Sequence, residues 1–262
     1  MAAAALIDPL YVLSGFVVGM LVGLTGVGGG SLMTPLLVLL FGIHPATAVG
    51  TDLLYAACTK TVGTLVHGAK STIEWRMVGL LAAGSLPAAT LTLYGLVQLG
   101  APSDSVSRLI SVVLGIALLL TSLSLVFRSS ILRWVTRGRR HEAPRRAASL
   151  TVLTGIVLGI VVSISSAGAG AMGVTLLILL YPHLPISRIV GSDIAHAVPL
   201  TLVSGLGHWW IGSVNWHVFT SLITGSIPGI VIGSLVATRV SDRFLTPILA
   251  GVLLLVGTKL LI

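Results

Sequence analysis

The sequence predicts an all-α polytopic membrane protein, and three features support this fold class. Of its 262 residues, 55% are hydrophobic and only 8% are charged, whereas soluble domains carry about 25% charged residues. Apolar blocks recur along the chain, and several are long enough to cross roughly 30 Å of hydrocarbon as helices. No stretch shows the alternation of the roughly ten-residue strands that build a membrane barrel. We therefore expect a bundle of membrane helices.

Ten apolar segments divide the chain, five on each side of an arginine-rich stretch. They cover 10–25, 32–41, 46–66, 77–99, 106–127, 150–165, 172–181, 189–208, 218–238 and 244–262. The second and seventh segments are too short to span alone and are expected to be half-helices or re-entrant pieces. We predict about ten transmembrane or half-transmembrane segments, with a first repeat over 1–127, a cytoplasmic connecting loop over 128–149 and a second repeat over 150–262.

The two halves repeat each other at a nearly constant spacing of 140 and then, after one inserted residue, 141. The matched positions are Gly15 and Gly155, Gly19 and Gly159, Gly28 and Gly168, Gly30 and Gly170, Pro45 and Pro185, Asp52 and Asp193, His67 and His208, Trp75 and Trp216, Ser85 and Ser226, and Pro87 and Pro228. Because these are rare residue types, the matches indicate an internal duplication.

The net charge of +8 is concentrated in one stretch. Seven of the fifteen Lys and Arg residues lie between Arg128 and Arg146, and basic residues collect in cytoplasmic loops. Placing this stretch in the cytoplasm puts twelve of the fifteen basic residues on that side and both termini outside. Five crossings per half then make the halves inverted copies, as in many secondary transporters. We expect lipid contacts for this stretch and no nucleic-acid partner.

Two glycine-containing loops interrupt the apolar segments at matched positions. Glycines let backbone N–H groups converge on a ligand, hydroxyls add donors, and the start of a helix adds a partial positive charge. Such a site suits a small anion. The candidate substrate-binding residues are Thr25, Gly28, Gly29, Gly30, Ser31, Thr34, Ser165, Ser166, Gly168 and Gly170. The alternative is that these glycines only let helices cross closely.

The second loop departs from the glycine pattern. Ala167, Ala169 and Ala171 stand where the first copy has valine, glycine and serine. A symmetric two-loop site is therefore doubtful, and we expect Gly28–Ser31 to contribute most to substrate binding.

Asp52, Lys60, Asp193 and His196 lie inside apolar segments, where a charge is costly and usually has a partner or a function. Asp52 and Asp193 could carry protons, line the site, or accept backbone hydrogen bonds as structural caps. Lys60 could be a counter-ion to either aspartate, bind the anion, or extend to the membrane surface. His196 lies one turn after Asp193, could pair with it, and could relay protons. We group these four as candidate coupling or gating residues.

The glycine-rich run over 26–35, the His-Pro-Ala-Thr-Ala-Val-Gly-Thr-Asp run over 44–52 and the duplicated plan resemble the TauE/SafE sulfite exporter family. The resemblance covers nearly the whole chain. It implies a multi-pass transporter in the inner membrane of a bacterium or archaeon, with sulfite or a related sulfur-containing anion as substrate.

We therefore predict a secondary transporter, and specifically an exporter, of a small anion that works by alternating access. Two alternatives remain open: an anion channel, and a proton-coupled ion exchanger that uses Asp52 or Asp193. The sequence has one cysteine and contains no His-Glu-x-x-His motif or other catalytic set, so we expect no enzyme activity, bound metal or cofactor. Assembly as a homodimer is left open.

Overall fold

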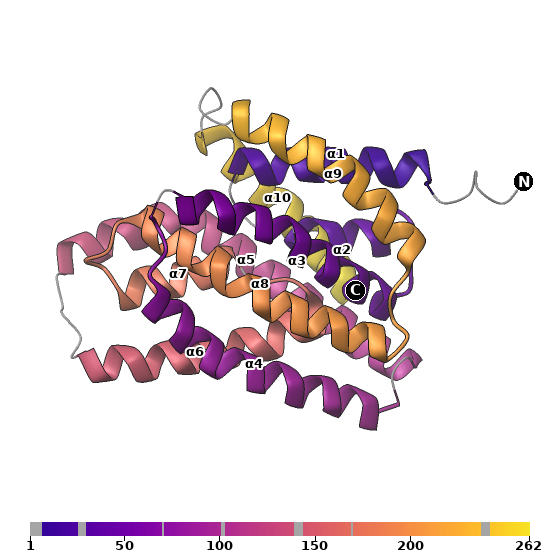
Figure 1. The fold of residues 1–262 in the computed structure, drawn as a ribbon, viewed down its shortest axis with the longest axis horizontal. Helices are drawn as coiled ribbons and strands as arrows, with labels where there is room; N and C mark the ends of the chain where they lie inside the picture. The colour runs from indigo at the N-terminus through magenta and orange to yellow at the C-terminus, as the bar shows by residue number, and fades with distance from the viewer. Residues whose placement is uncertain are drawn as a thin grey trace, which may run out of the picture.

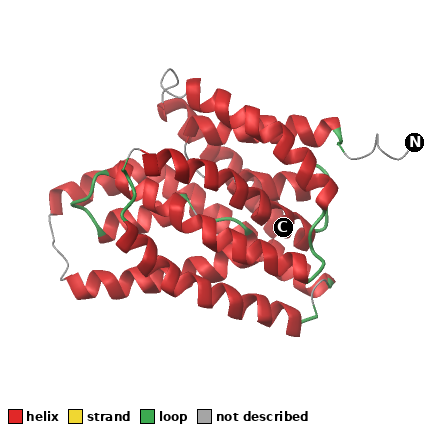
Figure 2. Ribbon diagram, in the orientation of Figure 1, coloured by secondary structure: helices red, strands yellow, loops and turns green. Residues whose placement is uncertain are grey.

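The structure, a computed structural model, describes residues 7–25, 30–69, 71–100, 103–138, 144–168, 170–236 and 242–262. Within these residues the chain is helical and contains no strand (Figures 1 and 2). The helices are α1 (Pro9–Thr25), α2 (Gly30–Leu39), α3 (Pro45–Ala69), α4 (Trp75–Gln98), α5 (Asp104–Gly138), α6 (Pro144–Ser165), α7 (Ala171–Leu180), α8 (Ile186–Trp210), α9 (Trp216–Val236) and α10 (Asp242–Leu261). The predicted all-α fold class is confirmed.

Five helical stretches among the described residues are long and apolar enough to cross a membrane: Trp75–Gln98, Asp104–Phe127, Arg146–Ser165, Ile186–Trp210 and Trp216–Gly233. Helices α2 and α7 have ten residues each, about 15 Å at 1.5 Å per residue. They are therefore half the length of a spanning helix, as the sequence predicted.

The arginine-rich stretch differs from the predicted connecting loop, because most of it is helical. Helix α5 continues to Gly138 and α6 begins at Pro144, while 139–143 lie outside the described residues. No glycine or proline interrupts the chain between Phe127 and Gly138, and proline suits the first position of a helix. At 35 residues, α5 is about 50 Å long and exceeds the thickness of the hydrocarbon core.

The helices pair across the two halves rather than within them. Helices α1 and α9 lie together along one side of the bundle, α4 and α6 along the opposite side, and α3 and α8 cross between them (Figure 1). Helices α5 and α10 also pack together. The matched helices α3 and α8 run in opposite directions (Figure 1), as an inverted duplication requires.

Matched glycines allow the two outer pairs to approach closely. A side chain at Gly15 on α1 would collide with the carbonyl oxygen of Leu222 on α9, and one at Gly155 on α6 would collide with that of Leu81 on α4. Small residues at such crossings let backbones touch in membranes. For these matched glycines, outside the two loops, close crossing is therefore the role that the structure gives them.

The two ends of the bundle carry different connections. The connections α3–α4 and α7–α8 lie at the left-hand end of Figure 1, together with the end of α5 and the start of α6, and the connection α8–α9 lies at the right-hand end, together with the end of α4 and the start of α5. Exposed tryptophans lie close to both ends: Trp75 begins α4, while Trp209 and Trp216 meet edge to face with ring centroids 5.7 Å apart. Tryptophans at the ends of membrane helices are typical of the lipid–water interface.

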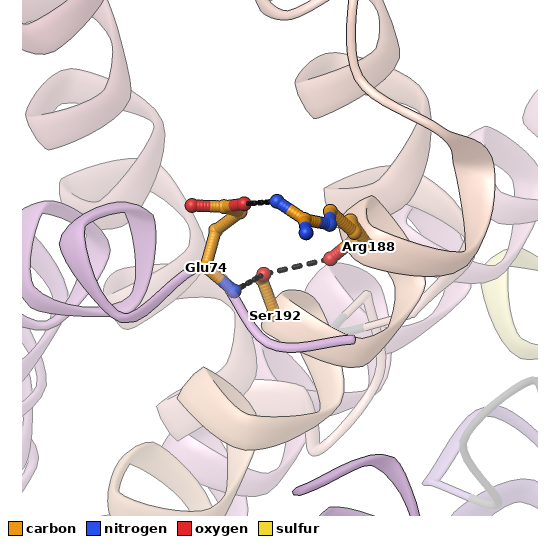
Figure 3. Close-up of polar contacts among 3 residues, drawn as sticks. All are labelled: Glu74, Arg188 and Ser192. Atoms are coloured by element: carbon orange, nitrogen blue, oxygen red, sulfur yellow. Dashed lines mark hydrogen bonds and ion pairs between the residues drawn. The ribbon is translucent and has the colours of Figure 1, made fainter. Parts of the chain in front are cut away.

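A polar contact at the start of α8 joins the halves at the left-hand end (Figure 3). The backbone N–H of Glu74 donates to Oγ of Ser192 at 2.8 Å, and the Glu74 carboxylate pairs with Arg188. At the opposite end, the N–H of Asn215 donates in the same way to Oγ1 of Thr51 at 3.0 Å. The backbone contact is thus duplicated, whereas the ion pair is not, because Glu74 matches Asn215 and Arg188 matches the uncharged Thr47.

Candidate functional site

Helices α3 and α8 bring the four predicted ionisable residues into one buried polar cluster, which consists of Asp52, Lys60, Asp193 and His196. Asp52 and His196 are fully buried, and Asp193 and Lys60 are 2% and 6% exposed. The positive charge of Lys60 interacts with both carboxylates and with the His196 ring. The fold thus brings these four residues into one region, and their roles in coupling or gating stay a prediction.

Asp52 is held by donors from both halves of the chain. Its Oδ2 accepts hydrogen bonds from the Thr34 hydroxyl, from the Thr34 backbone N–H at 3.2 Å and from the Ser166 hydroxyl at 2.9 Å. Thr34 lies on α2 and Ser166 in the break between α6 and α7. Asp52 therefore joins the two regions in which the sequence predicted substrate-binding loops.

Asp193 occupies the matched position on α8, but its half has no hydroxyl that matches those of Thr34 and Ser166. Its Oδ1, like that of Asp52, is buried and has no hydrogen-bond partner among the described residues. This oxygen lies so close to Gly173, in the first turn of α7, that a side chain there would collide with it. Glycine at this position is what makes room for the carboxylate beside the start of α7.

Lys60 lies eight residues after Asp52 on α3. It has no basic counterpart, since Thr201 stands at the matched position. Its electrostatic attraction to Asp193 is stronger than its attraction to Asp52. At 6% exposure its charge is buried together with theirs, so the prediction that it extends to the membrane surface does not describe this structure.

His196 bonds across the halves and not to Asp193. Its Nε2 lies 2.7 Å from Oγ of Ser85 on α4, and its Nδ1 has no partner among the described residues. The matched contact joins Tyr55 Oη on α3 to Oγ of Ser226 on α9, also at 2.7 Å. Tyr55 occupies the position that matches His196, and Ser226 the one that matches Ser85.

The break between α6 and α7 is buried and non-helical at 166–168 and at 170, the residues of it that the structure describes. Ser166, Gly168 and Gly170 have φ values of 57°, 103° and 125°, a region that favours glycine and is unusual for serine. Ser165 and Ser166 are buried; the Ser165 hydroxyl bonds to the carbonyl of Val161 at 2.7 Å and the Ser166 hydroxyl to Asp52. Irregular backbone at such depth occurs where it is packed in protein or lines a water-filled space.

The first glycine loop is described only in part. Gly28 and Gly29 lie outside the described residues, as do the side chains of Thr25 and Ser31. Gly30 begins α2 and Thr25 ends α1. Of the first set of predicted binding residues, Thr34 is therefore the one whose contacts are visible, and it contacts Asp52.

Known proteins are similar to this chain over nearly its whole length. The sequence profile of the family described as "Sulfite exporter TauE/SafE" matches residues 11–260. The chain belongs to the TauE/SafE sulfite exporter family. It is 40% identical to a Bacillus subtilis relative named "Probable membrane transporter protein YjnA", over 95% of this chain and 98% of the relative.

More distant TauE/SafE relatives have the same kind of name. A second Bacillus subtilis protein, "Probable membrane transporter protein YdhB", is 27% identical over 94% of this chain and 99% of its own length. "Probable membrane transporter protein MJ0441" of Methanocaldococcus jannaschii is 25% identical over 82% of this chain and 76% of its own. No solved structure matches. The chain is therefore a multi-pass membrane transporter of the cell membrane.

Three residues of this TauE/SafE site were not predicted to belong to it: Ser85, Tyr55 and Gly173. The signal for Ser85 was present, because it matches Ser226 in the repeat, but the repeat alone does not say which helix either serine faces. Gly173 has no glycine counterpart at position 33, so no repeat signal pointed to it.

Proposed function

We propose that the chain is a secondary transporter that exports a small anion, sulfite or a related sulfur-containing anion, by alternating access between its inverted halves. The observation that carries this proposal is the buried α6–α7 break, which meets α2 at Asp52. Interrupted helices that meet inside a duplicated bundle are a frequent setting for transporter substrate sites. The printed names of the relatives support transport, and the name of the family supports the substrate class.

In this proposal the substrate is held by backbone and hydroxyl donors. The first N–H groups of α2 and α7 have no partner within their own helices, and they favour a negative charge. Residues of both loops, Gly28–Ser31 with Thr25 and Thr34, and Ser165–Gly170, would surround the anion. Lys60 would supply a buried positive charge near the anion. Anion binding is one of the three roles that the sequence left open for Lys60.

Export is favoured by the membrane potential. An interior that is negative by 100 mV drives each negative charge outward with about 2.3 kcal/mol. A carrier that moves the anion alone would therefore suffice, and the cell would need no ATP for this step.

Uptake of radiolabelled sulfite, thiosulfate, sulfate and methanesulfonate into proteoliposomes tests the proposal. We expect uptake of at least one of the sulfur-containing anions and acceleration of that uptake by unlabelled anion on the opposite side, because a carrier exchanges its cargo. Uptake without such counterflow would indicate the channel alternative, and uptake of a cation in place of all four anions would overturn the anion assignment.

The Gly29→Val variant tests the loop, with Gly79→Val as its control, since Gly79 on α4 has open space around it. Loss of uptake in Gly29→Val, with thermal unfolding like that of the control, supports a role in binding. Equal uptake in both variants contradicts it.

A further inference from the structure

Resting on the proposed function, we infer that Asp193 carries a proton in step with the anion, whereas the matched Asp52 stays ionised as a fixed hydrogen-bond acceptor. The duplication would thus have produced one structural and one exchangeable carboxyl group. Three observations support this assignment.

The first observation is the charge of the buried polar cluster. Two carboxyl groups share one buried cation, Lys60, and His196 is held by a neutral hydroxyl. With both aspartates ionised the cluster carries one negative charge that Lys60 does not compensate, which favours binding of a proton by one of the two carboxyl groups.

The second observation decides which carboxyl group that is. Asp52 accepts three hydrogen bonds, from Thr34 twice and from Ser166, and donors to a carboxylate favour its ionised form. The positions that match these two donors in the other half are Val174 and Gly26. Neither has a side-chain donor, so the matched stabilisation of Asp193 is missing from the sequence itself.

The third observation is the surroundings of Asp193. Helix α8 packs against α3, α4, α6 and α7. From α3, Lys60 attracts Asp193 and also interacts with Asp52. On α8 itself, His196 turns to Ser85. Arg76 on α4 and Arg146 on α6 are exposed close to helix starts, and α7 contributes Gly173. The attraction of Lys60 is what allows Asp193 to release its proton again.

These contacts describe an exchange of counter-charges. With no anion present, the ionised Asp193 and Asp52 share the positive charge of Lys60. An anion that enters beside the start of α7 would meet the Asp193 carboxylate there and be repelled by it. A proton from water therefore binds Asp193. The anion then replaces the Asp193 carboxylate as the negative charge near Lys60. When the anion leaves, the proton returns to water on the same side. One proton therefore crosses with each anion, so a divalent anion leaves with one net negative charge and the membrane potential still favours its export.

Proteoliposomes with a trapped pH indicator and radiolabelled sulfite test the coupling. In the wild-type protein we expect sulfite uptake to acidify the interior and to respond to an imposed pH gradient. In Asp193→Asn we expect the proton signal and the response to the gradient to be lost. Sulfite uptake by Asp193→Asn with the full proton signal would overturn the inference.

Infrared difference spectra separate this inference from the choice of substrate, because they need no transported anion. Lowering the pH of the detergent-solubilised wild-type protein should produce the carbonyl band of a buried protonated carboxyl group. We expect this band to be absent from Asp193→Asn. If the wild-type protein moves none of the four anions, but the band is present in the wild type and absent from Asp193→Asn, the anion assignment alone is contradicted. A band that persists in Asp193→Asn would overturn the role of Asp193.

A second variant keeps the test decisive if Asp193→Asn does not fold. Ser166→Ala removes a donor to Asp52 and leaves Asp193 untouched. A band that arises from Asp193 should stay in place in this variant. A band that shifts would belong to Asp52 and would contradict the inference.

Discussion

Thr34 and Ser166 reach the same carboxylate oxygen of Asp52 from opposite halves of the chain. At the residue scale this is the contact that defines the site, because it fixes the α6–α7 break against α2. Asp193 has the same place in its own half and lacks both donors. Two residues that the repeat presents as equivalent therefore differ in chemistry.

Thr34→Val should destabilise the protein by about 1.5–3 kcal/mol, the usual contribution of a hydrogen bond to a charged group. The variant keeps the shape of the side chain and removes a donor from buried Asp52. Thr201→Val is a suitable control, since that buried hydroxyl bonds to a carbonyl of its own helix. Denaturant unfolding in detergent measures both, and an equal loss in the two variants would contradict the role of Thr34.

Lys60→Met should destabilise the protein by about 3 kcal/mol, because removing one partner of buried opposite charges leaves the other uncompensated. Adding Asp193→Asn should restore more stability than adding Asp52→Asn, since the attraction of Lys60 to Asp193 is the stronger one. A double-mutant cycle from denaturant unfolding measures both couplings. A larger coupling with Asp52 would show that Lys60 serves mainly the other carboxylate.

At the scale of helices, the fold is set by close pairs that join the two halves. Glycines on α1 and α6 lie against backbone carbonyls of α9 and α4 at matched positions. In a second kind of cross-half contact, backbone N–H groups of the loops before α4 and α9 donate hydrogen bonds to hydroxyls of α8 and α3. Backbone-to-backbone and backbone-to-hydroxyl contacts thus join the two halves at matched positions.

Gly15→Ala should destabilise the α1–α9 pair by about 1–3 kcal/mol, the usual effect of overpacking, because its methyl group would collide with the carbonyl of Leu222. Gly79→Ala, with open space around it, should be neutral. The midpoint of thermal unfolding compares the two. If Gly15→Ala unfolds no earlier than Gly79→Ala, the helices do not cross as closely as described.

Ser192→Ala should cost more stability than Glu74→Gln. Ser192 is fully buried and accepts the Glu74 backbone N–H, and a buried donor left unpaired costs about 1–3 kcal/mol. The side chains of the Glu74–Arg188 pair are 31% and 47% exposed, and exposed ion pairs contribute about 0–1 kcal/mol. Denaturant unfolding of both variants settles the order, and the reverse order would make the ion pair the main contact.

At the scale of the whole molecule, the inverted halves give the two ends of the bundle a matched framework with unlike charges. Arg188 and the arginine-rich end of α5 lie at the same end (Figure 1), and the matched contact at the other end is uncharged. A bundle that is symmetric in its backbone is therefore polarised in its charges, which orients it in the membrane.

Labelling of single cysteines tests this orientation in a Cys58→Ala background. Ser71 and Ser105 are both exposed and lie at opposite ends of α4 and its following connection. We expect Ser105→Cys to react with a membrane-impermeant maleimide in intact cells and Ser71→Cys to react after lysis alone. The reverse pattern would place the arginine-rich stretch outside.

The sequence predicted the helices better than it predicted which helices and side chains contact one another. Apolar length identified all ten segments, and the short α2 and α7 followed from counting residues. The helical extension of α5 was missed, because charge was taken as the mark of a loop while the stretch holds no helix breaker. Asp52, Lys60, Asp193 and His196 were found because charge is rare in apolar segments. The contacts of Ser166 with Asp52 and of Ser85 with His196 were not, because a repeat spacing does not say which faces meet.

The pairing of α1 with α9 has a consequence for how the protein is made. The ribosome releases α1 first, yet its partner helix is released only after most of the chain has been synthesised, so α1 must wait in lipid or beside an insertion factor. The same pairing means that neither half can complete its bundle alone. Two separately encoded halves could assemble only if they entered the membrane in opposite orientations, which is the arrangement expected of an ancestor that formed an antiparallel dimer before its gene was duplicated and fused.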